Sequence, residues 1–173
     1  MTLRRITKVD TALFYWLNRF SSNSNIIKGI RAISKTGDGH LYICFGALLF
    51  WLDSSHGALF FYTTLMAYAL EIPIYLILKQ CFKRKRPTAT LLNFNAHITP
   101  SDKFSLPSGH TAAAFLMATI VSSFYPTFSV VAFSWAGSVG LSRILLGVHF
   151  PSDVIIGAIL GAGIASISML LLT

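Results

Sequence analysis

The sequence predicts an all-α protein, a polytopic bundle of membrane helices with about five spanning helices. Of its 173 residues, 54% are hydrophobic and only 12% are charged, which is about half the charged fraction of an average soluble domain. The mean hydropathy is +0.64. The apolar residues gather in five runs that polar or proline-containing turns separate, and such runs are typical of helices that cross a bilayer.

The first 38 residues are expected to form an interfacial amphipathic region, and residues 39–173 the helical core of a single integral-membrane domain. Residues 9–20 and 25–36 mix apolar side chains with charged ones, so neither run is apolar enough to span. Both fit helices that lie in the headgroup layer with their basic side toward lipid phosphate. Helices packed on the bundle are the alternative. No secretory signal stands out, because Lys8 and Asp10 precede any long apolar run.

The five predicted spans cover residues 40–52, 58–82, 111–125, 127–146 and 154–172. The first is short for a hydrocarbon layer of about 30 Å unless its flanks are helical too. A polar segment, residues 83–108, separates the second span from the third, and Pro126 separates the third from the fourth. Pro151 opens the last helix, at a position where proline is favoured.

Polar stretches at residues 79–87, 107–110 and 142–153 lie where spans begin or end. Ionisable groups beside hydrocarbon are costly and usually functional. Because consecutive spans reverse direction, the ends of the second and fourth spans lie on the same side of the membrane as the starts of the third and fifth. The predicted topology therefore brings six side chains together: Lys79, Arg86, His110, Arg143, His149 and Asp153.

The cations of this group suit a phosphate. Lys79, Arg86 and Arg143 are enough to offset a dianion, and guanidinium groups match phosphate oxygens in pairs. Ser108 and Gly109 open a helix whose free N–H groups can hold an anion. We therefore expect these five residues to bind a phosphoryl group.

The two histidines suit phosphoryl transfer, which needs an in-line nucleophile and a proton donor for the leaving oxygen. Asp153 follows His149 by four residues, one helical turn, so its carboxylate can hold one imidazole nitrogen and leave the other free to attack. His149 is therefore the expected nucleophile. His110 is the expected general acid, which later activates water.

The sequence predicts no metal and no other cofactor at this site. The acidic residues are scattered along the chain, whereas a two-metal site normally needs clustered carboxylates. Nucleic acid is excluded as a partner because the basic residues are interleaved with spans. The expected partners are the bilayer and a membrane lipid phosphate, to which a net charge of +8 is suited. The oligomeric state stays open.

Three complete motifs occur in order over residues 79–153: K-x6-R-P (Lys79, Arg86, Pro87), P-S-G-H (residues 107–110) and S-R-x5-H-x3-D (residues 142–153). Together they resemble the signature of the type 2 phosphatidic acid phosphatase family, which includes the vanadium haloperoxidases and glucose-6-phosphatase. The resemblance implies a metal-independent lipid phosphatase with a helical membrane core and the same residue roles. Many bacterial members have six spans, so this chain is expected to lack the first.

The expected reaction is hydrolysis of a phospholipid phosphomonoester or a polyprenyl diphosphate through a phosphohistidine intermediate. Phosphatidate, phosphatidylglycerophosphate and undecaprenyl diphosphate are candidate substrates, and residues 88–104 carry no readable specificity pattern. Two alternatives stay open. One is a lipid phosphotransferase that uses the same intermediate, and the other is a non-catalytic membrane protein that binds or translocates lipid phosphates.

Two further features are interpreted from the pattern alone. Lys83, Arg84 and Lys85 are expected to face lipid headgroups. Glu71 lies in the middle of a predicted span, where a carboxylate is costly unless it is paired. The favoured interpretation is a polar group bonded to a neighbouring helix near Pro73. The alternative is that Glu71 orients Lys79 or lines the route of the substrate.

The side of the membrane on which the site lies is left open by two conflicting arguments. With five spans, all fourteen Lys and Arg residues fall on the side of the site. The positive-inside rule then places the site at the cytoplasmic face of a bacterial inner membrane. The family resemblance instead implies the periplasmic face.

Overall fold

The computed structural model describes residues 2–21, 23–100 and 102–172, with side chains from residue 7 onward. The secondary structure of its described part consists of helices and no strands, which confirms the predicted fold class. The elements are α1 (Thr2–Asn18), η1 (Arg19–Ser21), α2 (Ser24–Lys35), α3 (Gly39–Leu52), α4 (Gly57–Phe82), α5 (Pro87–Thr90), α6 (Gly109–Phe124), η2 (Pro126–Phe128), α7 (Ser129–Leu145) and α8 (Pro151–Leu172).

Five apolar helices occupy the predicted positions. Within the described residues, three segments are long and apolar enough to cross a membrane: α4, η2 with α7, and α8. Helices α3 and α6 have 14 and 16 residues, so they extend only about 21 and 24 Å. Both are shorter than a hydrocarbon layer of about 30 Å.

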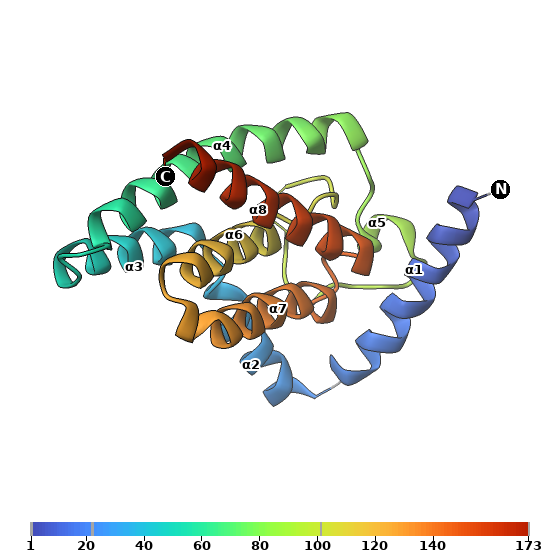
Figure 1. Cartoon of the computed structure of the whole chain (residues 1–173). Coiled ribbons are helices and arrows are strands. Elements are labelled where there is room, and N and C mark those ends of the chain that lie inside the picture. Colours follow the sequence, from blue (N-terminus) through green and yellow to red (C-terminus); the bar gives the residue numbers. More distant parts are fainter. Residues whose placement is uncertain (1, 22, 101, 173) are drawn as a thin grey trace.

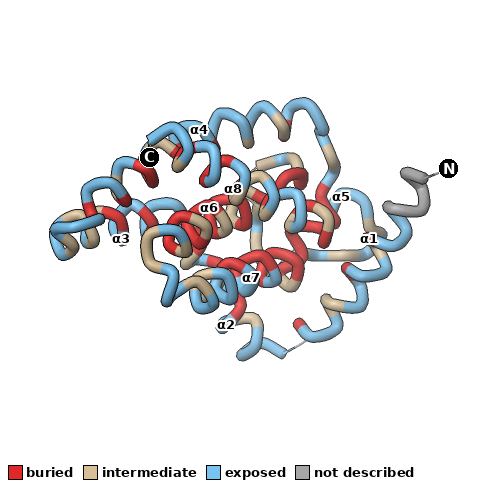
Figure 2. Tube along the Cα trace, viewed as in Figure 1, coloured by how far each residue is buried: buried red, intermediate tan, exposed pale blue. Residues whose placement is uncertain are grey.

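Helix α6 lies at the centre of the bundle (Figure 1). It packs on α8 and α7 and, less extensively, on α4, while α3 packs mainly on α4. The largest cluster of buried apolar side chains includes Phe60, Leu116, Ile120 and Val139. Burial is concentrated along α6 and the inner faces of its neighbours, and the outer faces are exposed (Figure 2).

Glycines on α8 allow its backbone to approach α6 closely. A Cβ atom on Gly161 would lie 2.0 Å from the carbonyl oxygen of Ala112, and one on Gly157 would lie 2.6 Å from that of Ser108. Small residues four apart are typical of close helix contacts in membranes. This contact fixes the start of α8 against the start of α6.

The N-terminal helices pack on the turn that joins α7 to α8. Phe14 of α1 is fully buried in a cluster with Ile144 and Phe150. Ile30 of α2 packs with Leu146 and Val148. The structure thus shows the packed alternative for both helices. Their placement in the headgroup layer stays a prediction. The exposed apolar side chains on α1 and η1 are compatible with it.

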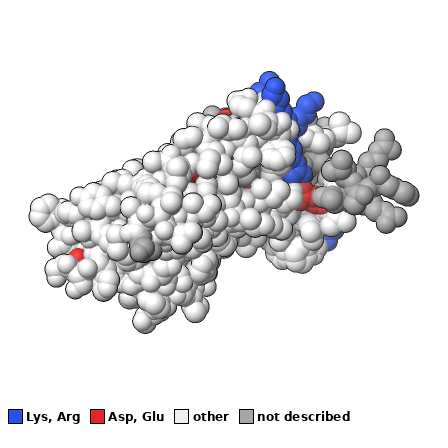
Figure 3. All heavy atoms as spheres, turned by 45° about the horizontal axis from the view of Figure 1, so that its top comes forward, with Lys and Arg blue, Asp and Glu red and all other residues white. Residues whose placement is uncertain are grey.

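The Lys and Arg side chains gather at one end of the face that Figure 3 shows. This end includes the C-terminus of α4 and the chain that follows it. The turn between α3 and α4, at the opposite end of α4, carries the acidic Asp53. The charge distribution along the bundle is therefore strongly asymmetric.

Candidate active site

Six of the eight predicted site residues line one cavity of about 240 Å³, where α4 ends, α6 begins and α7 turns into α8. They are Lys79, Arg86, Gly109, His110, Arg143 and His149. Asp153 and Ser108 lie behind this wall and are fully buried. Residues that are up to 70 positions apart in the sequence thus surround a single space.

His149 reaches the cavity from a turn outside the helices. Helix α7 ends at Leu145, and Gly147 just beyond it has φ +79°, the left-handed conformation that commonly terminates helices. The imidazole is only 2% exposed, its Nε2 lies 3.3 Å from Nη1 of Arg86, and its Nδ1 lies 3.6 Å from Oδ2 of Asp153. Burial lowers the pKa of His149 to about 4, although the nearby carboxylate of Asp153 acts in the opposite direction. The ring is therefore neutral at pH 7.

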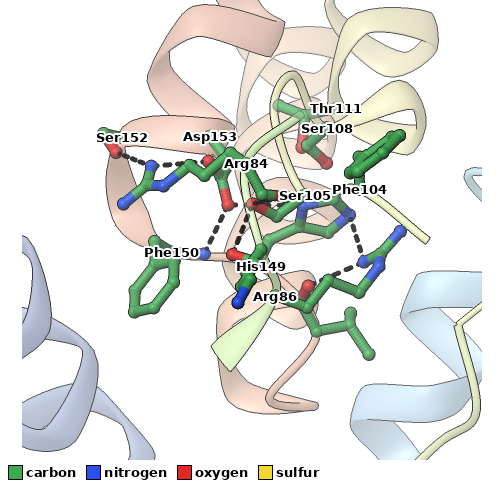
Figure 4. A network of polar contacts seen from close by, with 12 residues as sticks. Arg84, Arg86, Phe104, Ser105, Ser108, Thr111, His149, Phe150, Ser152 and Asp153 are labelled. Carbon is green, nitrogen blue, oxygen red and sulfur yellow. Dashed lines mark hydrogen bonds and ion pairs between the residues drawn. The ribbon is translucent and has the colours of Figure 1, made fainter. Parts of the chain in front are cut away.

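Asp153 is held in place from three sides. Its Oδ2 accepts a hydrogen bond from the backbone N–H of Phe150 at 2.8 Å, as an acidic residue in a capping box does. Its Oδ1 accepts one from Arg84 at 2.6 Å. Its own carbonyl accepts the N–H of Ser108 at 3.0 Å. Figure 4 shows the carboxylate between Arg84 and the backbone of Phe150, on the same side as His149.

Arg84 does not face the headgroups, so this part of the prediction for the basic run is wrong. Its guanidinium forms ion pairs with Asp10 and Asp153 and lies 4.5 Å from the centroid of the Phe150 ring. The reason is local: Lys83 ends α4 with φ +47°, which turns the following residues back across the start of α8. Arg84 therefore connects α1 to the carboxylate that supports His149.

Asp102 bridges two of the predicted phosphate-binding cations. Its Oδ2 accepts a hydrogen bond from Lys79 at 2.6 Å, and its Oδ1 accepts one from Arg86 at 2.8 Å. Tyr75 donates to the same carboxylate at 3.1 Å. Burial raises the pKa of Asp102, but the hydrogen bonds from Lys79 and Arg86 outweigh it and lower the pKa to about 2. The carboxylate is therefore charged at physiological pH.

Arg143 differs from these cations because it has no carboxylate within ion-pair distance in the described part of the chain. It is 5% exposed, its Nη1 donates to the hydroxyl of Ser34, and its Nε has no partner among the described residues. A buried guanidinium without a counter-charge is costly, and a bound anion would supply one.

His110 lies in the first turn of α6, and its Nε2 is 3.0 Å from Oδ1 of Asp38. Gly109 lines the cavity beside it. The hydroxyl of Ser108 shares a hydrogen bond of 2.8 Å with that of Thr111. The structure therefore brings the backbone of the predicted anion cradle to the cavity and turns the serine side chain toward its own helix.

Glu71 lines the same cavity from α4. It is 4% exposed, and its Oε1 has no partner among the described residues, so the expected bond from this atom to a neighbouring helix is absent. Lys79 is bound by Asp102 rather than by Glu71. The geometry therefore favours the interpretation that Glu71 lines the route of the substrate.

Sequence reasoning missed three acidic residues that contact the site. Asp102 is the one acidic residue in the polar segment 83–108. A single carboxylate in a segment that carries predicted phosphate-binding cations is a signal that could have identified it as their partner. Asp38 lies between the predicted segments 25–36 and 40–52 and belongs to none of the three motifs. Asp10 lies in the run 9–20, which predicts an amphipathic helix, and nothing in the local sequence connects it to Arg84.

The described residues include no group of three or more His, Cys, Asp or Glu side chains that could hold a metal ion. Around the cavity, the positive charge comes from Lys79, Arg86 and Arg143 instead. The independence of the reaction from metals stays a prediction.

Comparisons with known proteins identify the family that the chain matches and several of its relatives. Residues 56–173 match the PAP2 superfamily. The decaprenylphosphoryl-5-phosphoribose phosphatase of Mycobacterium tuberculosis is 36% identical over 68% of this chain and 58% of its own length. The bacitracin transport permease protein BcrC of Bacillus licheniformis is 30% identical over 69% of this chain and 60% of its own length. The chain thus spans less than two thirds of either relative.

The crystal structure of Aquifex aeolicus LpxE superposes with a TM-score of 0.80 and 27% sequence identity, covering 92% of this chain and 94% of that one. The matched segment contains the three motifs and every residue that lines the cavity from Glu71 to His149. The chain belongs to the PAP2 superfamily.

Proposed function

We propose that the protein is a metal-independent lipid phosphatase that hydrolyses a phospholipid phosphomonoester or a polyprenyl diphosphate through a phosphohistidine. The observation that carries this proposal is that His149 and His110 line one cavity together with Lys79, Arg86 and Arg143. One phosphoryl group in that cavity would contact the neutral imidazole of His149, the imidazole of His110 and three cations, which are the parts that in-line transfer requires. The carboxylate of Asp38 and the bound phosphate would favour the protonated form of His110.

In the first step, Nε2 of His149 attacks phosphorus and the bond to the leaving oxygen breaks. Nδ1 carries the ring proton toward Asp153, which stabilises the positive charge that develops on the imidazole. His110 donates a proton to the leaving oxygen. In the second step His110 takes a proton from water, the oxygen attacks phosphorus, and the N–P bond breaks to release phosphate.

The cations replace the metal of other phosphatases in this proposal. Lys79, Arg86 and Arg143 can neutralise the charge on the equatorial oxygens. Phosphate would displace Asp102 from Lys79 and Arg86 and would give Arg143 the counter-charge that it lacks among the described residues.

The lipid nature of the substrate is supported by a second, apolar cavity of about 590 Å³ between α3, α6 and α7. It runs from Thr36, next to Gly37 of the catalytic cavity, to Tyr125 near the far end of α6. Hydrocarbon chains fit such a space while the headgroup reaches the histidines. The name of the mycobacterial relative, a phosphatase of a decaprenyl lipid, agrees with this choice.

The test is phosphate release from phosphatidate, phosphatidylglycerophosphate and undecaprenyl diphosphate in the presence of EDTA. We expect release from at least one lipid, and we expect His149→Ala to lower kcat by roughly three orders of magnitude or more. His56→Ala, at the exposed turn between α3 and α4, is the control with unchanged activity. Loss of activity with EDTA would overturn metal independence, and release by His149→Ala at the normal rate would overturn the mechanism.

A translocating protein is the second candidate, because one relative is named a transport permease. It predicts that His149→Ala keeps its function in cells. A transferase predicts that the phosphoryl group passes to a second lipid and that no phosphate containing an oxygen from labelled water is released. Hydrolysis predicts one labelled oxygen in each released phosphate.

We propose further that the site faces the cytoplasm of a bacterial inner membrane. All fourteen Lys and Arg residues fall on the side of the site when five helices span, and the positive-inside rule then applies. A topology reporter fused after the last residue should report the periplasm, because α8 runs away from the site. A reporter in the cytoplasm would place the site at the periplasmic face.

A further inference from the structure

A further cavity, of about 620 Å³, adjoins the catalytic one. Three basic residues of α2, Lys28, Arg31 and Lys35, line it. The two cavities share Asp38, His110 and Arg143 as a common wall. We call the second space the α2 cavity.

The two cavities differ in charge. Three cations and three carboxylates line the catalytic cavity: Lys79, Arg86, Arg143, Asp38, Glu71 and Asp102. Four cations and one carboxylate line the α2 cavity: Lys28, Arg31, Lys35, Arg143 and Asp38. The excess of positive charge thus lies beside the catalytic cavity rather than inside it.

The basic side chains of α2 form a stripe because they are spaced by three and four residues, which places them on one face of the helix. The opposite face is fixed on the protein through Ile30, which is buried against Leu146 and Val148. Arg31 donates a hydrogen bond to the carbonyl of His97 across the cavity. Lys28 and Lys35 have no carboxylate within ion-pair distance in the described ranges. The stripe is therefore held in place while the positive charges of these two lysines are not neutralised by an ion pair.

The position of the two histidines gives this cavity a role. His149 lines only the catalytic cavity, whereas His110 lines both. In the proposed function the nucleophile and the general acid lie on opposite sides of phosphorus, so the leaving oxygen points toward His110. The part of the leaving group next to this oxygen therefore lies at the α2 cavity, while its hydrocarbon chains can lie in the apolar cavity that begins at Thr36.

We infer that the α2 cavity binds a second anionic group carried by the leaving group, so that the substrate is a lipid with two phosphoryl groups. This inference rests on the proposed function and narrows its substrate class. The N–P bond to His149 forms, the bond from phosphorus to the leaving oxygen breaks, and His110 protonates that oxygen. The lipid product keeps its second phosphate in contact with Lys28 and Lys35. A polyprenyl diphosphate and a phosphatidylglycerophosphate meet this requirement, and phosphatidate does not.

An anionic lipid of the bilayer is the other source of such a group. Exposed lysines alone would suit it. The α2 cavity shares a wall with the catalytic cavity at the buried Arg143 and at His110. An anionic group bound there lies next to the general acid, which favours a group that belongs to the substrate over one that belongs to a bulk lipid.

The experiment compares two lipids with the same acyl chains, phosphatidylglycerophosphate and phosphatidate, on the full-length protein in neutral detergent. We expect kcat/KM to be about tenfold or more higher for phosphatidylglycerophosphate, mainly through KM. We expect Lys28→Gln combined with Lys35→Gln to remove most of that preference, and added salt to weaken it because exposed charges are screened.

The matched control is Lys8→Gln combined with Arg19→Gln, which removes the same charge from α1 and η1 and leaves both cavity walls intact. The inference is overturned if the α2 variant and this control behave alike, or if the α2 variant lowers kcat/KM equally for both lipids. It is also overturned if the preference arises only when phosphatidylglycerol is added, which would assign the stripe to bulk lipid. Failure of every lipid to release phosphate would instead contradict the proposed function.

Discussion

The two nitrogens of His149 meet different surroundings. Nε2 lies beside the guanidinium of Arg86 at the cavity wall, and Nδ1 points toward the buried carboxylate of Asp153. A cation beside Nε2 disfavours a proton there, whereas a carboxylate beside Nδ1 favours one. The environment therefore selects the tautomer in which the lone pair of Nε2 faces the position of the phosphoryl group.

The charge state of this imidazole can be measured directly. Because burial lowers the pKa of His149 to about 4, the neutral form should persist as the pH falls through 6.5, the usual value, and should be lost only near pH 4. A nitrogen NMR titration of isotope-labelled histidine in the phosphate-free protein would test this, with His149→Asn to assign the signal. Half-protonation of His149 near pH 6.5 would contradict the expected environment.

Asp102 occupies the cations that the phosphoryl group needs. Since its carboxylate is charged above about pH 2, it competes with phosphate over the whole range in which the protein can be assayed. We expect Asp102→Asn to bind inorganic phosphate about tenfold more tightly, because a neutral amide is a weaker acceptor for Lys79 and Arg86. The inhibition constant of phosphate measures this effect.

The control for this change is Asp53→Asn, which removes one negative charge from the α3–α4 turn at the far end of α4. It should leave phosphate inhibition unchanged. Weaker inhibition by phosphate in Asp102→Asn would show that the carboxylate organises the cations rather than competing for them.

At the scale of elements, the contact of α6 with α8 sets the distance between the two histidine-bearing segments. Gly161→Ala would place a methyl group 2.0 Å from the backbone oxygen of Ala112, so the helices must separate. We expect a loss of about 1–3 kcal/mol in the free energy of unfolding and a fall in kcat.

Gly163→Ala is a matched control on the same helix, because nothing lies within 4 Å of its added methyl group. Thermal unfolding in detergent and the rate of phosphate release compare the two variants. Equal stability of Gly161→Ala and Gly163→Ala would contradict the close packing of α6 and α8.

Helices α1 and α2 hold the turn that carries His149. Phe14 is fully buried against Phe150 and Ile144, so Phe14→Ala should lower the free energy of unfolding by about 3–5 kcal/mol and reduce kcat as the turn loosens. Leu13→Ala, at an exposed neighbouring position, should change either quantity little. Full activity and stability in Phe14→Ala would assign α1 to membrane attachment alone.

At the scale of the whole molecule, hydropathy and span parity were enough to predict the five apolar helices and the meeting of three distant stretches. Both follow from the bilayer, which forces apolar runs into helices and alternates their direction. The amphipathic pattern of α1 and α2 could not decide between a lipid surface and a protein surface, because both present the same apolar environment to Phe14 and Ile30.

The carboxylates around the site could not be predicted in the same way. Asp102 meets Lys79 and Arg86 through the path of a loop, and Arg84 meets Asp10 and Asp153 through the reversal at Lys83. Asp38 meets His110 because α2 packs on α7. These contacts depend on tertiary structure, on which the local pattern of polar residues carries no information.

The central claim is that two imidazoles act in turn on one phosphorus atom. Rapid quenching of the enzyme with a lipid that carries a radiolabelled phosphate tests it, because phosphohistidine is stable in base and labile in acid. We expect the label on His149 in the wild type and none in His149→Ala. In His110→Ala both the formation and the hydrolysis of the phosphohistidine should slow, because His110 acts in both steps. Label on another residue, or turnover at the normal rate in His149→Ala, would contradict the account.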